Sequence, residues 1–260
     1  MKYNMLRGYD IYLNERYSKD TARTYRTRLN FLLEEQFFID NFDDVDFEKV
    51  INQLSKIKHK NYFSQCKNAL FHFAEFQGQK INHEEKKKIS ELEQKTHKKY
   101  RKRKEIDYQN VLSSVNYLKN DKLKLCFLTM ISTGLRVSEL AQITPQLSHI
   151  SNKEIIFDFI GKGGESETVT LLKSDNKELF EKLVNHIQNT EDDDKKVFYS
   201  AIYLQENAKN LGFKCHDLRR IYAQLKYKET RDKNEVRKKL RHVNIKTTNI
   251  YLKCKIKGLK

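Results

Sequence analysis

The sequence contains one proline and no tryptophan among its 260 residues. Because proline is the residue that most strongly interrupts helices, its scarcity favours a mainly helical fold. No stretch approaches the roughly 18 consecutive apolar residues that a membrane-spanning helix needs, and the first residues do not resemble a signal peptide. We therefore expect a soluble, cytoplasmic protein without a membrane partner.

Paired cysteines are also absent. The four cysteines, Cys66, Cys126, Cys215 and Cys254, are scattered without any CxxC pair, which argues against both a zinc site and a disulfide framework. We predict reduced thiols that mostly fill the core. The acidic run EDDD at 191–194 is interpreted as a solvated loop rather than a metal site. No metal and no cofactor are therefore expected.

Positive charge is what the sequence has in excess. Lysine and arginine number 51 against 35 aspartate and glutamate residues, for a net charge of +16, and the basic residues are spread along the whole chain. This balance is typical of proteins that bind nucleic acids. With 38% hydrophobic and 11% aromatic residues, the chain is expected to fold. Its length is sufficient for two domains.

Residues 1–79 show the spacing of four amphipathic helices, which together predict a small helical bundle. The expected helices are Asn4–Arg16, 20–35 after a cap at Ser18, 47–57 after a cap at Asp46, and Lys60–Phe76, which Gly78 ends. Basic side chains along the second helix could follow a phosphate backbone, although a solvated helix face is the alternative. These residues are Lys19, Arg23, Arg26 and Arg28.

Apolar residues become rare over residues 80–104, which we interpret as a linker that is helical at first. It ends in a basic cluster at 98–104 that includes Arg101, Lys102 and Arg103. Charge runs are usually solvated, yet a basic hinge between two basic domains is also what a clamp around DNA requires. We predict DNA contacts for this cluster.

Residues 105–260 are predicted to form a second domain that is mainly α with a small β-hairpin or sheet, in the α+β class. The runs KEIIFDFI at 153–160 and ETVTLL at 167–172 are rich in β-formers and are separated by GKGG. Helices are expected at 108–117, Lys122–Ser132, Lys177–Gln188, Ile202–Leu211, His216–Lys228, Asp232–Arg241 and Lys246–Cys254.

Three stretches of this second domain carry residue types suited to phosphodiester chemistry. They are TGLRVSEL around Arg136, IGKGGE around Lys162, and the C-terminal segment from HDLRR to LRHVNIKTTNIY. In this order the stretches resemble the boxes of the tyrosine recombinase (phage integrase) family, and the resemblance covers roughly residues 107–260. It implies a catalytic set of Arg136, Lys162, His216, Arg219, His242 and the nucleophile Tyr251, with Glu139 in support. The N-terminal bundle is compatible with the family's core-binding domain.

The residue types also fit the chemistry. A tyrosine hydroxyl has a pKa near 10 and needs an acid/base partner at neutral pH, a role that suits His216. The guanidinium groups of Arg136 and Arg219 can bind the nonbridging phosphate oxygens bidentately, which stabilises the transition state without a metal. By resemblance, Lys162 protonates the leaving 5′ oxygen and His242 donates a hydrogen bond to the phosphate.

Tyr222 and Tyr227 are the rival nucleophiles. Both lie on the helix that presents Arg219, whereas Tyr251 lies on a separate segment, so Tyr251 is preferred.

Several positions depart from the family pattern. Arg241 stands where the family usually has glycine, Glu165 and Glu167 replace basic residues after the hairpin lysine, and Arg220 follows the HDLR motif. We expect Arg220 and Arg241 to add DNA contacts, with crowding of the turn as the alternative for Arg241. The nine residues after Tyr251 predict a short or missing C-terminal helix for exchange between subunits, and no arm-binding domain is expected.

The function implied by the resemblance is site-specific DNA recombination through a 3′-phosphotyrosyl intermediate, without ATP, in integration, excision or resolution. The alternatives are a type IB topoisomerase or hairpin-forming resolvase with the same chemistry, and a non-catalytic DNA-binding accessory protein on the same fold. The expected partner is double-stranded DNA, with a homotetramer on paired sites, a monomer when free, and association with the nucleoid.

Overall fold

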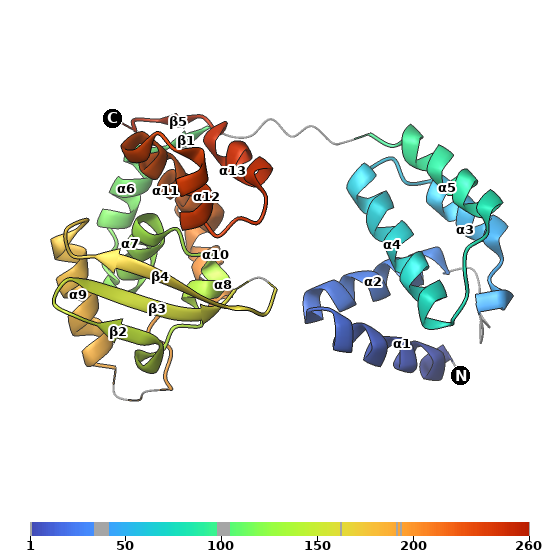
Figure 1. The fold of residues 1–260 in the computed structure, drawn as a ribbon, viewed down its shortest axis with the longest axis horizontal. Helices are drawn as coiled ribbons and strands as arrows, with labels where there is room; N and C mark the ends of the chain where they lie inside the picture. The colour runs from blue at the N-terminus through green and yellow to red at the C-terminus, as the bar shows by residue number, and fades with distance from the viewer. Residues whose placement is uncertain are drawn as a thin grey trace. The chain divides into compact units, whose positions relative to one another are not determined.

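The computed structural model describes residues 2–33, 42–97, 105–161, 163–190, 192 and 194–259. The chain forms two compact units, residues 1–102 (the N-terminal unit) and 103–260 (the C-terminal unit) (Figure 1). The described part of the N-terminal unit is helical, and the C-terminal unit combines helices with a small antiparallel sheet. This agrees with the predicted fold class. No helix in the described part of the chain is long and apolar enough to cross a bilayer.

The N-terminal unit forms the predicted bundle. Its elements are α1 (Lys2–Arg16), α2 (Lys19–Leu32), the 3₁₀ turn η1 (Phe42–Asp44), α3 (Phe47–Ser55), α4 (Lys60–Phe76) and α5 (His83–Lys95). The predicted caps are present, because Ser18 Oγ accepts from Thr21 N and Asp46 Oδ1 accepts from Glu48 N. Tyr9, Phe63 and other fully buried side chains form the core.

Helix α5 belongs to this bundle, although a linker was expected from residue 80. A capping box between Asn82 and Glu85 starts the helix. Ile81 and Ile89 are buried in the bundle core, and Leu92 packs against it. So few apolar anchors in a charged segment make a weak sequence signal, yet they suffice to attach the helix. The basic cluster at 98–104 lies outside the described residues.

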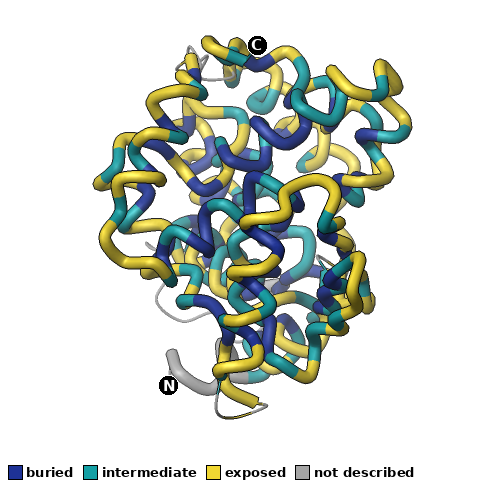
Figure 2. The backbone as a smooth tube through the Cα atoms, turned by 90° about the vertical axis from the view of Figure 1, so that its left-hand side faces the viewer, coloured by how far each residue is buried: buried dark blue, intermediate teal, exposed yellow. Residues whose placement is uncertain are grey.

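The C-terminal unit surrounds a single large core. Its helices are α6 (Tyr108–Asn116), α7 (Asp121–Thr133), α8 (Val137–Leu140), α9 (Lys177–Gln188), α10 (Ala201–Asn210), α11 (Cys215–Thr230), α12 (Lys233–Lys239) and α13 (Ile245–Leu252), with the 3₁₀ turn η2 (Pro145–Leu147). Helix α11 packs against α7, α10, α12 and α13. In Figure 2 the helices alternate between buried and exposed segments, as amphipathic helices do.

The sheet extends the predicted hairpin by one strand. Strands β3 (Glu154–Ile160) and β4 (Ser166–Leu172) are antiparallel with Phe157 opposite Val169, and β2 (Ser148–Ile150) adds to the other edge of β3. A short parallel pair joins β1 (Ile106–Asp107) to β5 (Ile256–Lys257). The sequence did not predict β1, β2 or β5, because two or three residues are too few to show alternation.

Candidate active site

Tyr251 and His216 meet across two helices. The hydroxyl of Tyr251, on α13, lies 2.6 Å from Nε2 of His216, in the first turn of α11. Tyr251 is buried and His216 is exposed as a residue, although the side of its ring that faces Tyr251 is covered. This burial, with the positive charges of Arg220 and Arg219, lowers the pKa of His216. The neutral imidazole can therefore accept the tyrosine proton.

His242 covers the other side of the phenol ring. It lies between α12 and α13, and its ring meets that of Tyr251 edge to face with centroids 4.9 Å apart. The hydroxyl of Thr248 is 2.9 Å from His242 Nδ1 and fixes the orientation of the imidazole. Burial, followed by the charges of Arg219 and Arg136, lowers the pKa of His242 to about 4. His242 is thus neutral at pH 7.

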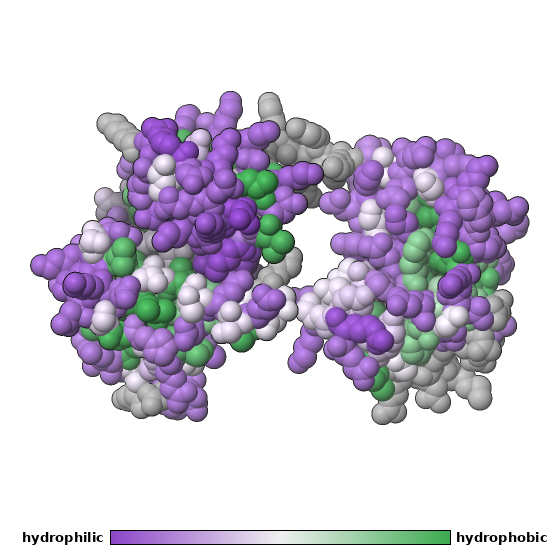
Figure 3. Space-filling view, viewed as in Figure 1, coloured by the Kyte–Doolittle hydropathy of each residue, from purple (hydrophilic) through white to green (hydrophobic). Residues whose placement is uncertain are grey.

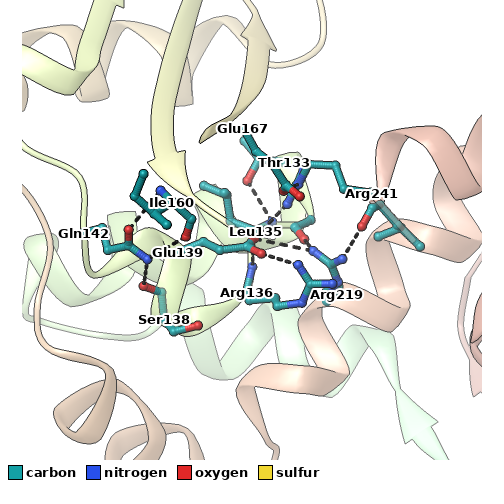
Figure 4. Close-up of polar contacts among 12 residues, drawn as sticks. Thr133, Leu135, Arg136, Ser138, Glu139, Gln142, Ile160, Glu167, Arg219 and Arg241 are labelled. Atoms are coloured by element: carbon teal, nitrogen blue, oxygen red, sulfur yellow. Dashed lines mark hydrogen bonds and ion pairs between the residues drawn. The ribbon is translucent and has the colours of Figure 1, made fainter. Parts of the chain in front are cut away.

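A carboxylate that is almost fully buried organises three arginines (Figure 4). Glu139 accepts from the side chain and the backbone N–H of Arg136, and its Oε2 lies 2.7 Å from Arg241 Nη2 and 3.7 Å from Arg219 Nη1. Burial by itself would raise the pKa of Glu139, but Arg241, Arg136 and Arg219 together lower it. Glu139 is therefore an ionised partner for the arginines.

Arg219 is buried and held through its backbone partners. Its two terminal nitrogens donate to the carbonyl oxygens of Gly134 and Leu240, whereas its buried Nε has no hydrogen-bond partner among the described residues. Burial and the nearby Arg136 lower the pKa of Arg219 to about 10, which leaves it charged at neutral pH.

Gly134 makes the turn that presents Arg136. It ends α7 in the left-handed conformation, with φ of +67°, and a Cβ there would lie 2.4 Å from the ring of Tyr222. Only glycine meets both requirements without strain. Arg136 follows two residues later as the cap of α8. The TGLR stretch therefore has a structural reason for its glycine.

A cavity of about 500 Å³ opens beside these groups. Its walls include Arg136, His216 and Arg219, together with Lys209 and Lys214 from the region of α10 and α11. A larger cavity of about 750 Å³ lies elsewhere in the C-terminal unit, between α6, α7, α9 and α11, and its lining does not include Arg136, His216, Arg219, His242 or Tyr251. The smaller cavity is lined by His216 together with Arg136 and Arg219, so we take it as the substrate side of the site.

The geometry agrees with the comparisons to known proteins. A model of the phage integrase family matches residues 104–256 of the chain, which is more than half its length. The chain belongs to the phage integrase family. A curated relative is tyrosine recombinase XerA from Pyrococcus furiosus, which is 25% identical over 284 aligned residues and covers 100% of this chain and 93% of the relative. The resemblance inferred from the motifs is thereby confirmed.

Solved structures of integrases have the same fold. A lambda integrase dimer bound to a COC′ core site aligns with a TM-score of 0.63 and 14% identity, over 99% of this chain and 96% of that one. XerH recombinase bound to its difH substrate aligns with a TM-score of 0.61 and 17% identity, over 88% of this chain and 74% of that one. At such identities the similarity shows the fold.

For this integrase chain, the structure brings together five of the six residues expected in the catalytic set, and Glu139 with them. The five are Arg136, His216, Arg219, His242 and Tyr251. The sixth, Lys162, lies outside the described residues. Their roles in catalysis remain predictions that rest on this geometry. The described residues contain no group of three or more His, Cys, Asp or Glu side chains that could hold a metal ion.

The residues predicted to contact DNA differ in their surroundings. Lys19 and Arg23 are exposed on α2, whereas Arg26 Nε lies 2.5 Å from Asp10 Oδ1. Arg220 pairs with Asp217 at 2.6 Å. Arg241 has the two carboxylate partners Glu139 and Glu167. The cluster Arg101, Lys102 and Arg103 lies outside the described residues.

Among the side chains around the site, the sequence motifs indicated neither Thr248 nor Gln142, and they marked Glu167 only as a departure from the family pattern. Thr248 orients His242. Glu167 pairs with Arg241, and Gln142 holds the end of β3 through both backbone groups of Ile160 (Figure 4). Thr248 lies three residues before Tyr251 and six after His242, a spacing that one helical turn could have indicated. The other two contacts join distant segments and leave no local signal.

Proposed function

We propose that this protein is a site-specific DNA recombinase in which Tyr251 forms the covalent bond to DNA. The observation that carries the proposal is the 2.6 Å contact between the Tyr251 hydroxyl and His216 Nε2, beside a cavity lined by Arg136 and Arg219. Family membership supports it. Two structurally similar proteins also support it, because XerH was solved bound to its difH substrate and lambda integrase was solved bound to a Holliday junction.

The reaction begins with a proton transfer and an in-line displacement. Tyr251 Oη attacks the phosphorus as its proton passes to His216 Nε2, a bond between Oη and phosphorus forms, and the bond to the 5′ oxygen breaks. The product is a 3′-phosphotyrosyl link and a 5′ hydroxyl. The lowered pKa of His216 keeps it in the form that accepts a proton.

The arginines act on the nonbridging oxygens, where negative charge develops. Three guanidinium groups and two carboxylates, Glu139 and Glu167, leave one positive charge in excess among these groups. A phosphate entering the cavity meets donors that are already held in place, which is the main requirement for electrostatic stabilisation of the transition state. Arg136, which is partly exposed, and Arg219, which lines the cavity, supply such donors.

The leaving 5′ oxygen needs a proton, and Lys162 is the proposed donor. Because the tyrosyl ester conserves the phosphodiester bond, attack by a different 5′ hydroxyl reverses the chemistry and joins a new strand without ATP. Exchange between two duplexes then requires four subunits on two sites.

We further propose that the chain is monomeric when free, that Lys19 and Arg23 contact the DNA backbone, and that the protein acts in the cytoplasm in association with the nucleoid.

The decisive test uses nicked suicide duplexes that tile the DNA flanking the encoding gene. Denaturing electrophoresis should show a covalent protein–DNA adduct with the wild-type chain and none with Tyr251→Phe, while DNA binding is unchanged. Tyr222→Phe is the matched control, since Tyr222 is buried against Gly134, and it should retain the adduct. An undiminished adduct with Tyr251→Phe would refute the assignment.

The same preparation separates recombination from relaxation. Supercoiled plasmid that lacks the flanking DNA should stay supercoiled in the presence of the wild-type chain. Relaxation of that plasmid would instead indicate a type IB topoisomerase activity.

A further inference from the structure

Two of the departures from the family pattern, Arg241 and Glu167, contact each other. Arg241 Nε lies 2.9 Å from Glu167 Oε2, and the side chains are 11% and 25% exposed. Arg241 also packs over the ring of Phe159 on β3, with its guanidinium carbon 5.0 Å from the ring centroid. The pair therefore links the residue just before His242 to the hairpin that carries the GKGG loop.

Arg241 reaches this position through an unusual backbone. It adopts φ of +53°, which a non-glycine residue rarely does. Glycine at this place would avoid the strain but would have no side chain to reach the hairpin. We call Glu139 and the arginines around it, Arg136, Arg219 and Arg241, the arginine cluster. Since Arg241 binds Glu139 with Nη2 and Glu167 with Nε, its single guanidinium connects the arginine cluster to β4 (Figure 4).

Glu167 packs against the end of β3, next to the GKGG loop. It lies opposite Phe159 in the sheet, and its carboxylate occupies the space above Gly161. A Cβ on Gly161 would lie 2.4 Å from the Glu167 carboxyl carbon, so only glycine leaves room for this contact. Gly161 is the residue immediately before Lys162, and its N–H donates to Glu165 O at 2.8 Å.

Gln142 fixes the same end of β3 from the α8 side. Its amide nitrogen donates to Ile160 O at 3.1 Å and its amide oxygen accepts from Ile160 N at 3.0 Å. The end of β3 is thus held by neutral hydrogen bonds to Gln142, while Glu167, opposite Phe159 in the sheet, joins the hairpin to Arg241 by an ionic contact. The backbone N–H of Gln142 also donates to the backbone oxygen of Glu139 at 3.1 Å, whereas Glu167 is linked to the Glu139 carboxylate through the charge of Arg241.

We propose that Glu167 and Arg241 are positioning residues, which hold the backbone at Gly161 in a fixed relation to the arginine cluster so that the leaving 5′ oxygen receives its proton. This inference rests on the proposed function and adds to it. Both atoms of the contact are buried without a hydrogen bond to a described residue, so the pair depends on charge. Removing the charge of Glu167 should therefore loosen the loop without removing any catalytic group.

The test compares two leaving groups on the suicide duplex that gives an adduct with wild type. One duplex has the ordinary 5′ oxygen, and the other has sulfur at that bridging position. A thiol has a pKa near 8.5 and departs without protonation, whereas an alkoxide needs the proton. Single-turnover cleavage of the sulfur substrate is thus insensitive to misplacement of the proton donor.

The variant is Glu167→Gln, which keeps the volume above Gly161 and removes only the charge. Cleavage of the oxygen substrate should slow by roughly 10-fold or more, since a positioned acid contributes about 100-fold or more. Cleavage of the sulfur substrate should stay within about twofold of wild type, with unchanged DNA affinity. Glu165→Gln is the matched control, because Glu165 is exposed on the same loop, and both of its rates should equal wild type.

A double-mutant cycle with Arg241→Gln tests the pairing. If the two side chains act together, Glu167→Gln should add almost nothing in the Arg241→Gln background. Equal slowing of both substrates by Glu167→Gln, a loss of DNA affinity, or no effect at all would each overturn the inference. Lys162→Ala separates this result from the proposed function: if the sulfur substrate does not restore its cleavage, the role of Lys162 itself is wrong.

Discussion

The arginines of the two units differ in how deeply they are buried and in how many partners they have. In the N-terminal unit, Arg26 on α2 has one acidic partner, Asp10, and its side chain is 40% exposed. In the C-terminal unit, Arg219 is 1% exposed and has two backbone carbonyls and Glu139 around it. Figure 3 shows that hydrophilic residues dominate the visible surface of both units, so polar surface alone does not distinguish them. Burial and the number of partners do.

This difference has an energetic meaning. An exposed ion pair contributes about 0–1 kcal/mol, since solvent and salt screen it. Removing one member of a buried pair costs about 3–5 kcal/mol, because a desolvated charge loses its partner. Arginines of the first kind can shift among phosphates, and those of the second kind are fixed before the substrate arrives. We expect the former to determine affinity and the latter to determine rate.

The largest effect should come from Arg219→Ala. The change leaves the carbonyl oxygens of Gly134 and Leu240 without their buried donor and removes one of the three positive charges around Glu139. A loss of about 3–5 kcal/mol should lower the melting temperature by roughly 10 °C, and the covalent adduct should disappear. Calorimetry and the suicide assay measure the two effects. Arg26→Ala is the control from the other unit and should change the melting temperature little; equal shifts would remove the contrast.

Gly134→Ala should have the next largest effect. Alanine at φ of +67° costs about 1–2 kcal/mol, and the clash with Tyr222 adds a similar amount. The turn that presents Arg136 would shift, so both the melting temperature and the cleavage rate should fall. If the clash matters, adding Tyr222→Ala should restore part of the stability lost by Gly134→Ala. A strictly additive double variant would contradict this account.

The sequence predicted those parts of the site that depend on residues close together in the chain, and it did not predict the contacts between residues far apart in the chain. The helices around Tyr251 and His216 were expected because their apolar spacing and caps are local signals, and the ordered motifs identified the family. The hub at Glu139 was expected only as a general support. Its contact with Arg241, 102 positions away, and that of Arg241 with Glu167 come from tertiary packing. A single sequence holds no pattern that links such distant positions.

Acidic pH should slow cleavage through His216. Its pKa is lowered by burial and by Arg220 and Arg219, so the neutral base persists at pH 7 and the decline begins below pH 6.5. Below the pKa in the folded protein, the rate should fall about tenfold per pH unit, because the protonated ring cannot accept the tyrosine proton. Arg220→Gln should raise the pKa of His216 and move this decline to higher pH. A pH–rate profile that does not move would show that Arg220 has no influence on the base.

The smallest effects should come from the exposed cations of α2. Their substitution tests whether exposed basic residues determine DNA affinity. Lys19 and Arg23 lie four residues apart, hence on one helix face, and both are exposed. Each phosphate contact contributes about 0.9 to the slope of log affinity against log salt concentration, so Lys19→Ala and Arg23→Ala should each reduce the slope by about 1. Melting temperature and cleavage rate at saturating DNA should not change, because neither side chain supports the fold or the site.

Lys87→Ala, an exposed cation on α5, serves as the control and should leave the slope as it is. If all three variants reduced the slope equally, binding would depend on the total charge of the bundle rather than on the face of α2.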